Sequence, residues 1–450
     1  MAASEAKVFD LEHRRKLQFN IGQYDKKVVD GKKQYKDLEL AKLRASHLKR
    51  KSIDSLDKYL IEFESNFIKR GGKVIWAQDE KDAIREIELI LKRAKARSVV
   101  KSKSMITEEI HLNEHLEKIG IEAVETDLGE YIVQLRKEPP YHIVTPAMHL
   151  SKEDVAKTFN EKFELPLEST PEQITAFVRE KLRAAYLSAN AGITGANFLI
   201  ADIGGVALTE NEGNAWMSVA FPKIHIAIAG IEKIIPSIAD LDLFWPLLAT
   251  FGTGQQVTVY NSIMTGPRQE HESDGPEEMY VILLDNGRTE LLAQKEQRQA
   301  LSCIRCGACL NGCPVYKNIG GHAYGGVYSG PIGSVIMPHL KGVKEYKHLS
   351  YASSLCGKCT EVCPVKIDIH KLLLYNRRDS IDSGLNTKAE KWIYFFWKKA
   401  MLNRDTMNKG GAKAKNFVLE NFFKKSWGKR RTLPKVAERS FNELWKEKFK

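Results

Sequence analysis

The chain has 450 residues, of which 43% are hydrophobic and 28% charged, and its formal net charge is +12. This length suffices for two or three domains that each bury a core, and the ordinary composition excludes intrinsic disorder as the default state. No apolar run reaches the roughly 20 residues that cross a bilayer, and the first residues lack the apolar segment of a signal peptide, so we expect a cytoplasmic protein.

Residues 1–70 form the first predicted segment, and their charged, amphipathic pattern favours helices. The last of these helices has the clearest apolar face, with i, i+3, i+4 spacing, formed by Leu56, Tyr59, Leu60, Phe63 and Phe67. Gly71 and Gly72 follow directly and are expected to end that helix.

Residues 71–290 are predicted to form an α/β domain, because short apolar runs alternate there with amphipathic stretches. Strands are expected over 73–77, 98–102 and 121–126, with helices over 79–96 and 107–120 between them. A helix over 171–189 leads into a second set, with strands over 198–208, 225–230, 255–261 and 278–286 and a short apolar helix over 241–252. The alternation indicates a mostly parallel sheet covered by helices.

Two polar clusters of this domain are candidates for ligand binding. The first lies where a strand leads into the helix over 107–120 and contains Lys101, Lys103, Ser104, Glu108, Glu109 and His111. The second follows the strand over 198–208 and contains Thr209, Glu210, Asn211, Glu212 and Asn214, with Gly204 and Gly205 before it as points of close ligand approach. Both patterns are equally typical of helix caps. No G-x-G-x-x-G motif opens a strand–helix unit, so a nicotinamide or flavin site is not supported.

All seven cysteines lie in two short motifs, which is typical of a metal centre in an intracellular protein. The first motif is Cys303-x2-Cys306-x2-Cys309-x3-Cys313-Pro314. Three thiolates at this spacing bind three irons of one iron–sulfur cube, one thiolate to each iron. In two-cluster ferredoxins the fourth cysteine binds the other cluster.

The second motif repeats the first except at one position, where Ser353 replaces a cysteine. Crossing the ligands between motifs predicts one complete set, Cys303, Cys306, Cys309 and Cys363, for a 4Fe–4S cluster (cluster 1). The other set, Cys313, Cys356 and Cys359, provides three ligands for cluster 2. Cluster 2 is then either 3Fe–4S or a 4Fe–4S cluster whose fourth iron takes Ser353, water or a partner's ligand. Zinc is the weaker alternative, because a four-thiolate zinc site needs no C-x2-C-x2-C triplet.

Residues 291–385 are predicted to be a helical ferredoxin-type module, entered through a helix over 291–300. Ile369, Leu372, Leu373 and Asn376 are spaced for one helix face after the second motif, where a regular ferredoxin would have a β-hairpin. The glycine-rich loop between the motifs contains His322, which we interpret as a structural loop histidine rather than a hydrogen-bond donor to cluster sulfide.

Residues 386–450 form a basic, aromatic tail that we expect to be helical. From residue 388 onward it has 18 Lys and Arg against 6 Asp and Glu, so the whole net charge lies here. Its first helix contains Trp392, Tyr394, Phe395, Phe396 and Trp397. We expect these rings to pack on the protein itself or on a partner protein, with the inner face of a membrane as the alternative. Nucleic-acid binding is the weakest option, and none is expected.

The cysteine motifs CIRCGACLNGCPVY and LCGKCTEVCPVKIDIH and the loop GGHAYGGVYSGPIGSV resemble the lactate utilisation protein B family. The segments KSKSMITEEIHLNEHL and GANFLIADIGGVALTENEGN are similar to the LUD domain of that family. The resemblance implies an iron–sulfur subunit of a complex that oxidises L-lactate to pyruvate, with the seven cysteines as cluster ligands. It also implies two partners, a cysteine-rich subunit of the heterodisulfide-reductase type and a smaller LUD-domain subunit.

From the residues alone, the chain is a two-cluster electron carrier joined to an α/β domain. We expect no catalytic residue in it, with substrate chemistry taking place at its partners. Two alternatives stay open: an electron carrier for another 2-hydroxy acid such as glycolate, and an iron–sulfur sensor or scaffold without turnover.

Overall fold

The computed structural model describes residues 2–428 and 431–449, and its contacts divide the chain into two units, 1–380 and 381–450. The first unit begins with four helices, α1 (Ala2–Phe9), α2 (Leu11–Gly31), α3 (Leu38–Asp54) and α4 (Leu56–Lys69), and the one-turn η1 (Lys32–Gln34). All five residues of the predicted apolar face of α4 are buried. Gly71, with φ +85°, follows α4, as expected of a residue that ends a helix.

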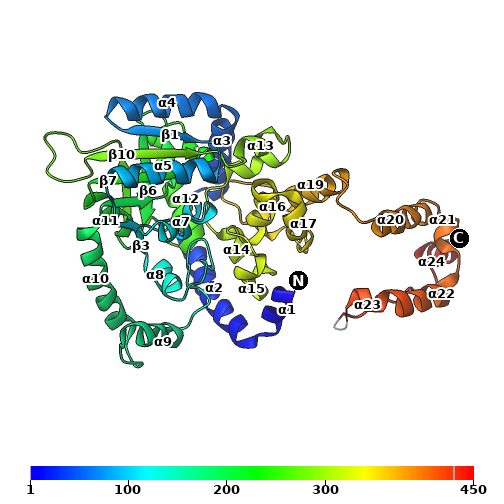
Figure 1. Ribbon diagram of the computed structural model, residues 1–450. Coiled ribbons are helices and arrows are strands. Elements are labelled where there is room, and N and C mark those ends of the chain that lie inside the picture. Colours follow the sequence, from blue (N-terminus) through cyan, green and yellow to red (C-terminus); the bar gives the residue numbers. More distant parts are fainter. Residues whose placement is uncertain (1, 429–430, 450) are drawn as a thin grey trace. The chain divides into compact units, whose positions relative to one another are not determined.

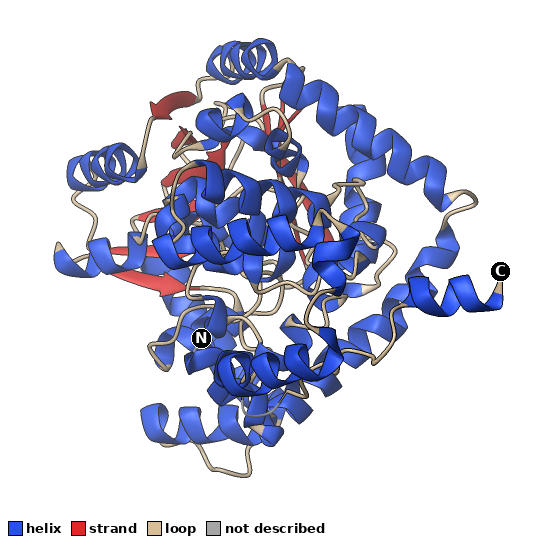
Figure 2. Cartoon of the chain, turned by 90° about the vertical axis from the view of Figure 1, so that its right-hand side faces the viewer, coloured by secondary structure: helices blue, strands red, loops and turns tan. Residues whose placement is uncertain are grey.

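A six-stranded parallel sheet forms the centre of the first unit, as the alternating pattern predicted (Figures 1 and 2). Its strands, in spatial order, are β1 (Lys73–Ala77), β10 (Glu278–Leu284), β7 (Ile224–Gly230), β4 (Ala191–Thr194), β2 (Ser98–Lys101) and β3 (Glu122–Glu125). The surrounding helices are α5 (Glu80–Arg93), α6 (Met105–Glu109), α7 (Leu112–Lys118), α8 (Leu128–Leu135), α9 (Lys152–Phe163), α10 (Pro171–Ser188), α11 (Asn214–Ala220) and α12 (Leu241–Thr253). Asp79 caps α5, at the predicted start of that helix.

A second, four-stranded sheet has the order β8 (Ile234–Ile235), β5 (Phe198–Ile200), β6 (Gly205–Glu210) and β9 (Tyr260–Met264). The single strand predicted over 198–208 is wrong, because the chain reverses at Gly204, φ +62°, and β5 and β6 pair antiparallel. The strand predicted over 255–261 begins only at Tyr260, because its partner β6 ends at Glu210, opposite Tyr260. The helix predicted over 107–120 is two helices, separated where His111 has φ +52°. Two 3-10 turns, η2 (Ile231–Lys233) and η3 (Ile238–Asp240), flank β8.

The cysteine region is helical, as predicted, and contains no strand in the fully described stretch 291–385. Its helices are α13 (Arg288–Ala293), α14 (Ala308–Asn311), α15 (Tyr316–Ile319), α16 (Gly330–Lys341), α17 (Val343–Tyr351), α18 (Lys358–Glu361) and α19 (Ile369–Asp382), with 3-10 helices η4 (Gln297–Ser302) and η5 (His322–Tyr324). The helix expected over 291–300 is replaced by the end of α13 and η4. The four residues predicted for one face of α19 are all buried.

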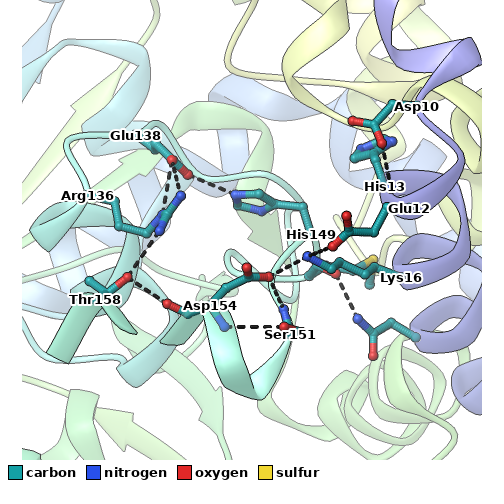
Figure 3. A network of polar contacts seen from close by, with 12 residues as sticks. Asp10, Glu12, His13, Lys16, Arg136, Glu138, His149, Ser151, Asp154 and Thr158 are labelled. Carbon is teal, nitrogen blue, oxygen red and sulfur yellow. Dashed lines mark hydrogen bonds and ion pairs between the residues drawn. The ribbon is translucent and has the colours of Figure 1, made fainter. Parts of the chain in front are cut away.

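The N-terminal helices contact the cysteine region although about 250 to 300 positions separate them in the sequence: α2 lies against α15 (Figure 1), and α3 against η4. On its other side α2 is joined to α9, because Lys16 pairs with Asp154 at 2.6 Å as well as with Glu12 on its own helix (Figure 3). The same view shows His149 bonded to Glu138 at 2.8 Å. The N-terminal segment is therefore an integral part of the unit.

The second unit consists of α20 (Lys388–Met401), α21 (Arg404–Asn408), α22 (Gly411–Val418), the π-helix η6 (Leu419–Phe423), α23 (Lys424–Trp427) and α24 (Phe441–Lys448). No residue of α20 is buried, and Trp392, Phe395 and Phe396 contact one another through their rings. Among the described residues, no helix combines the length and the apolar character that a membrane crossing requires.

His225 on β7 is expected to make the stability of the first unit fall in mild acid. Its side chain is fully buried, and burial lowers its pKa from 6.5 to about 3. The unfolded chain therefore takes up the proton first, so this stability is complete above pH 6.5 and is lost as the pH falls toward 3. At pH 5 the loss is about 2 kcal/mol. Urea unfolding at pH 7 and pH 5 should show a smaller loss for His225→Gln, and equal losses in both proteins would contradict the prediction.

Candidate functional site

The first cysteine motif wraps around a left-handed backbone turn. Arg305 and Gly307 have φ of +61° and +82°, and Gly307 starts the short helix α14. The Arg305 N–H points back to the Cys303 Sγ at 3.4 Å. A glycine suits this position, because a Cβ on Gly307 would also lie 3.1 Å from Val144. The backbone of the motif thus turns tightly beside the Cys303 sulfur.

The second motif repeats this geometry. Leu355 and Gly357 have φ of +54° and +80°, and Gly357 starts the equivalent helix α18. The Leu355 N–H donates to the Ser353 Oγ at 3.1 Å, the counterpart of the bond from Arg305 to Cys303. Ser353 therefore occupies the place of the absent eighth cysteine in structure as well as in sequence. It lines a small cavity together with Cys313, Cys356 and Cys359.

The electrostatic neighbours of the thiols fall into two groups. Burial raises the pKa of Cys306, and the nearby Cys303 and Cys363 sulfurs raise it further. Burial likewise raises the pKa of Cys359 to about 11, with Cys313 and Cys356 adding to it. Each group thus combines cysteines from both motifs. This grouping favours the crossed ligand sets, which stay a prediction.

The surroundings of the first group suit a negatively charged iron–sulfur cluster. Burial lowers the pKa of Lys49 to about 7 and of Lys233 to about 8, although the Cys303 sulfur opposes both shifts. The Cys303 sulfur has three basic neighbours, Lys49, Lys233 and Arg305. An oxidised 4Fe–4S cluster with four thiolates is a dianion, so positive charge at this position would stabilise it. The buried Arg305 Nη1 also lacks a hydrogen-bond partner, and cluster sulfur would provide one.

A cavity of about 420 Å³ lies beside this group, at the carboxyl ends of the parallel strands. It brings together both polar clusters of the α/β domain, since its lining includes Lys103, Ser104, Thr209, Glu210, Asn211, Glu212 and Asn214. Arg305 and Cys306 line it from the cysteine region. Carboxyl ends of parallel strands are where open α/β sheets bind ligands.

The rest of the first polar cluster lies elsewhere. Lys101 is fully buried in an ion pair with Glu125 at 2.7 Å, which with other carboxylates raises its pKa against the effect of burial. Glu109 accepts two bonds of 2.9 Å from Arg288, and His111 is exposed at the break between α6 and α7. Lys101 and Glu109 take part in buried ion pairs, and none of these three side chains lines the cavity.

Two sequence interpretations concerned loop residues. The prediction that a ligand approaches closely at Gly204 and Gly205 is wrong, because neither glycine lines the cavity. Gly204 instead packs against α4, where a Cβ on it would lie 2.3 Å from the backbone of Phe67. His322 bonds to the Pro139 carbonyl at 2.7 Å and packs against Tyr141, as the structural interpretation predicted. The glycines beside it allow this packing, since a Cβ on Gly320 would overlap the Tyr141 hydroxyl.

Lys233 and Asp127 line the cavity but were not among the candidates from the sequence. Lys233 follows the carboxyl end of the predicted strand over 225–230, and Asp127 follows the strand over 121–126. Polar residues directly after parallel strands were the available signal. Their meeting with the cysteine motif depends on the packing of the two regions and has no local signature.

Comparison with known proteins gives two family matches: the LUD domain over residues 60–284 and the 4Fe-4S dicluster domain over residues 299–367. The uncharacterized electron transport protein YkgF of Escherichia coli is 47% identical over 348 residues, 77% of this chain and 73% of that protein. Lactate utilization protein B of Bacillus cytotoxicus is 42% identical over 412 residues, 89% and 86% of the two chains. The protein of the same name from Shouchella clausii is 41% identical over 418 residues, 90% and 88% of the chains.

The fold and the two cysteine motifs define an iron–sulfur protein that joins a LUD domain to a dicluster module. The chain belongs to the lactate utilization protein B family, with relatives that align over most of both chains. The dicluster match supports two iron–sulfur clusters in this chain. A crystal structure of a DUF162 family protein from Deinococcus radiodurans aligns with 51% of this chain and 98% of its own, at 14% identity and a TM-score of 0.30, a likeness too low to carry an argument.

Proposed function

We propose that this chain is the iron–sulfur electron-transfer subunit of a complex that oxidises L-lactate to pyruvate. The observation that carries the proposal is that one helical module contains two separate groups of cysteines. One of these groups borders the cavity of the LUD domain. The names of the relatives, lactate utilization protein B and electron transport protein, supply the substrate and the role.

Cys303, Cys306, Cys309 and Cys363 hold cluster 1, a 4Fe–4S cluster, in this proposal. Cys313, Cys356 and Cys359 hold cluster 2 as its three cysteine ligands. This cluster is either 3Fe–4S or a 4Fe–4S cluster whose fourth iron takes Ser353, water or a partner's ligand. Electrons then pass between the clusters through the module, and the two-electron oxidation of lactate matches two one-electron carriers. The potentials of such clusters span several hundred millivolts, so the direction of flow depends on the partners.

The partners in this proposal are a cysteine-rich subunit of the heterodisulfide-reductase type and a smaller LUD-domain subunit. The test is made on the complex recovered from its native cells without oxygen. L-lactate is expected to bleach the iron–sulfur absorbance, whereas D-lactate and glycolate are not. Bleaching by glycolate alone would indicate that glycolate is the substrate of the complex. Clusters that are reduced by dithionite but by no hydroxy acid would contradict lactate as the substrate. A sensor would instead lose cluster 2 in oxygen and change its partner binding.

Replacing Ser353 with cysteine is expected to complete the second ligand set. The Ser353 Oγ already has the position and the backbone bond of Cys303, so a thiolate needs little rearrangement there. In electron paramagnetic resonance spectra, any 3Fe–4S signal of the oxidised wild type should disappear in Ser353→Cys, and cluster 2 should survive longer in air. The matched control is Ser354→Cys, one position away. A variant that keeps the iron content and air sensitivity of the wild type would contradict a ligand position at residue 353.

For the tail, contact with an anionic membrane surface is the alternative to packing on the protein itself or on a partner protein. Exposed Trp392, Phe395 and Phe396 on α20 lie among lysines, and rings with lysine suit the headgroup region. The full chain should float with vesicles containing phosphatidylglycerol, and less so at high salt, while a chain ending at Leu385 should stay in solution. Equal behaviour of the two chains would favour docking on a partner protein.

A further inference from the structure

The cavity beside cluster 1 has the location and size of a small-molecule site. Its lining includes Ser104 and Gly195, which follow the carboxyl ends of β2 and β4, Gly230 at the carboxyl end of β7, and Arg305 and Cys306 from the cysteine region. The chain runs outward from β2 to β3 and then crosses back to β4, so the crevice lies at a reversal of strand order, the usual ligand position in such sheets. A volume of about 420 Å³ lies within the range of ligand pockets.

Two lysines that line the cavity have ammonium N–H donors that no described protein acceptor uses. Lys233 has no hydrogen bond or ion pair with any residue in the described ranges 2–428 and 431–449. Lys103 donates to the Val144 carbonyl at 2.5 Å, which leaves two of its three protons. A bound carboxylate would give both ammonium groups an acceptor.

The charges around the cavity limit which anion fits. The lining contains four basic side chains, Lys103, Lys233, Arg288 and Arg305, and four acidic ones, Asp127, Glu210, Glu212 and Glu232. Arg288 and Arg305 already pair with Glu232. The other three carboxylates, Asp127, Glu210 and Glu212, accept backbone N–H bonds. They would repel a nucleotide or another polyanion, whereas the two lysines can hold a single carboxylate group.

The acidic part of the lining favours a ligand that also has a hydroxyl or carbonyl group. Burial, and to a smaller extent the Asp127 carboxylate, raise the pKa of Glu212 to about 7. Glu212 therefore exchanges a proton near neutral pH. Such a carboxyl can accept from a hydroxyl or donate to a carbonyl. Several uncharged donors, including Ser104, Asn197 and Thr209, complete the polar lining.

We propose that this cavity binds a small monocarboxylate of the 2-hydroxy or 2-oxo acid class, with its carboxylate on Lys233 and Lys103. The identity of the acid rests on the proposed function, whereas the preference for a small carboxylate over a polyanion follows from the lining. A ligand bound here lies directly beside Cys306. The site thus assigns substrate or product binding to a chain whose sequence pointed only to electron conduction.

The test uses the full chain with both clusters, prepared without oxygen, and measures binding of pyruvate by titration calorimetry. Pyruvate is chosen because it is already oxidised and cannot reduce the clusters. Saturable binding is expected, weakened about tenfold or more in Lys233→Gln and in Lys103→Gln, because each loses a charge-assisted hydrogen bond. The matched control is Lys223→Gln, an exposed lysine at the opposite, amino end of β7, which should bind as the wild type does. The visible spectrum of each variant checks that the clusters are intact.

Three results would overturn the site. The first is no saturable binding of pyruvate or L-lactate, and the second is unchanged affinity for pyruvate in both cavity variants. The third is binding of inorganic phosphate to the site at concentrations where pyruvate does not bind. The lactate function is judged separately, by bleaching of the native complex. If L-lactate bleaches that complex and Lys233→Gln leaves the KM for lactate unchanged, the function stands and the site is wrong. If no hydroxy acid bleaches it but pyruvate still binds through both lysines, the site stands and the function is wrong.

Discussion

Changing Cys363 to alanine is expected to remove cluster 1, although this residue belongs to the second motif. Burial raises the pKa of Cys363 to about 12, and the Cys303 sulfur of the first motif adds to the shift, so the two thiols are neighbours. With three cysteine ligands left, cluster 1 should lose its 4Fe–4S form and at least one iron atom per chain. Iron analysis and electron paramagnetic resonance of the dithionite-reduced protein measure the loss, and the signal of cluster 2 should persist.

Cys313→Ala is the matched control, because it lies in the first motif and should remove cluster 2 instead. Burial raises the pKa of Cys313, and the Cys356 sulfur of the second motif adds to the shift. If Cys363→Ala and Cys356→Ala eliminated the same signal, the ligand sets would run within each motif and the crossed assignment would be wrong.

Changing Arg288 to methionine is expected to have the largest effect on stability. Its guanidinium is buried and bonds to Glu109 at two distances of 2.9 Å and to Glu232 at 2.6 Å. Glu109 also accepts from the Tyr328 hydroxyl at 2.6 Å, so the network joins α6 to the cysteine region. Removing the cation leaves two buried carboxylates without their main partner, which costs about 3–5 kcal/mol of the free energy of unfolding. Thermal or urea unfolding of the protein with its clusters measures the loss.

Arg85→Met is the matched control for this prediction. Arg85 pairs with Asp82 at 2.9 Å on the surface of α5, where its side chain is 61% exposed and water screens the pair. The two variants lose the same charge from arginine and gain the same side chain. A loss in Arg288→Met no greater than in Arg85→Met would show that the buried network does not stabilise the fold.

Local patterns predicted the elements whose burial depends on their own sequence. The apolar faces of α4 and α19 are buried as their spacing predicted, and the parallel sheet follows from the alternation of strands and helices. The errors occur where a residue distant in sequence determines the bounds of an element. Strand β9 starts at Tyr260 because its partner β6 ends at Glu210. The strand predicted over 198–208 is divided where Gly204 packs against α4. No pattern within a few residues records such a partner.

The sequence by itself determined the chemistry of the cysteine motifs, since ligand spacing, left-handed turns and the substitution at Ser353 are properties of a few consecutive residues. Only the tertiary structure decided which charges meet. It joined Glu109 to Arg288, 179 positions away, placed Lys101 in an internal ion pair, and set Lys103 and Lys233 around one cavity beside Cys306. The physical reason is that hydrogen-bonded turns and periodic burial are short-range, whereas a charge inside a protein takes its role from partners that long-range packing brings to it.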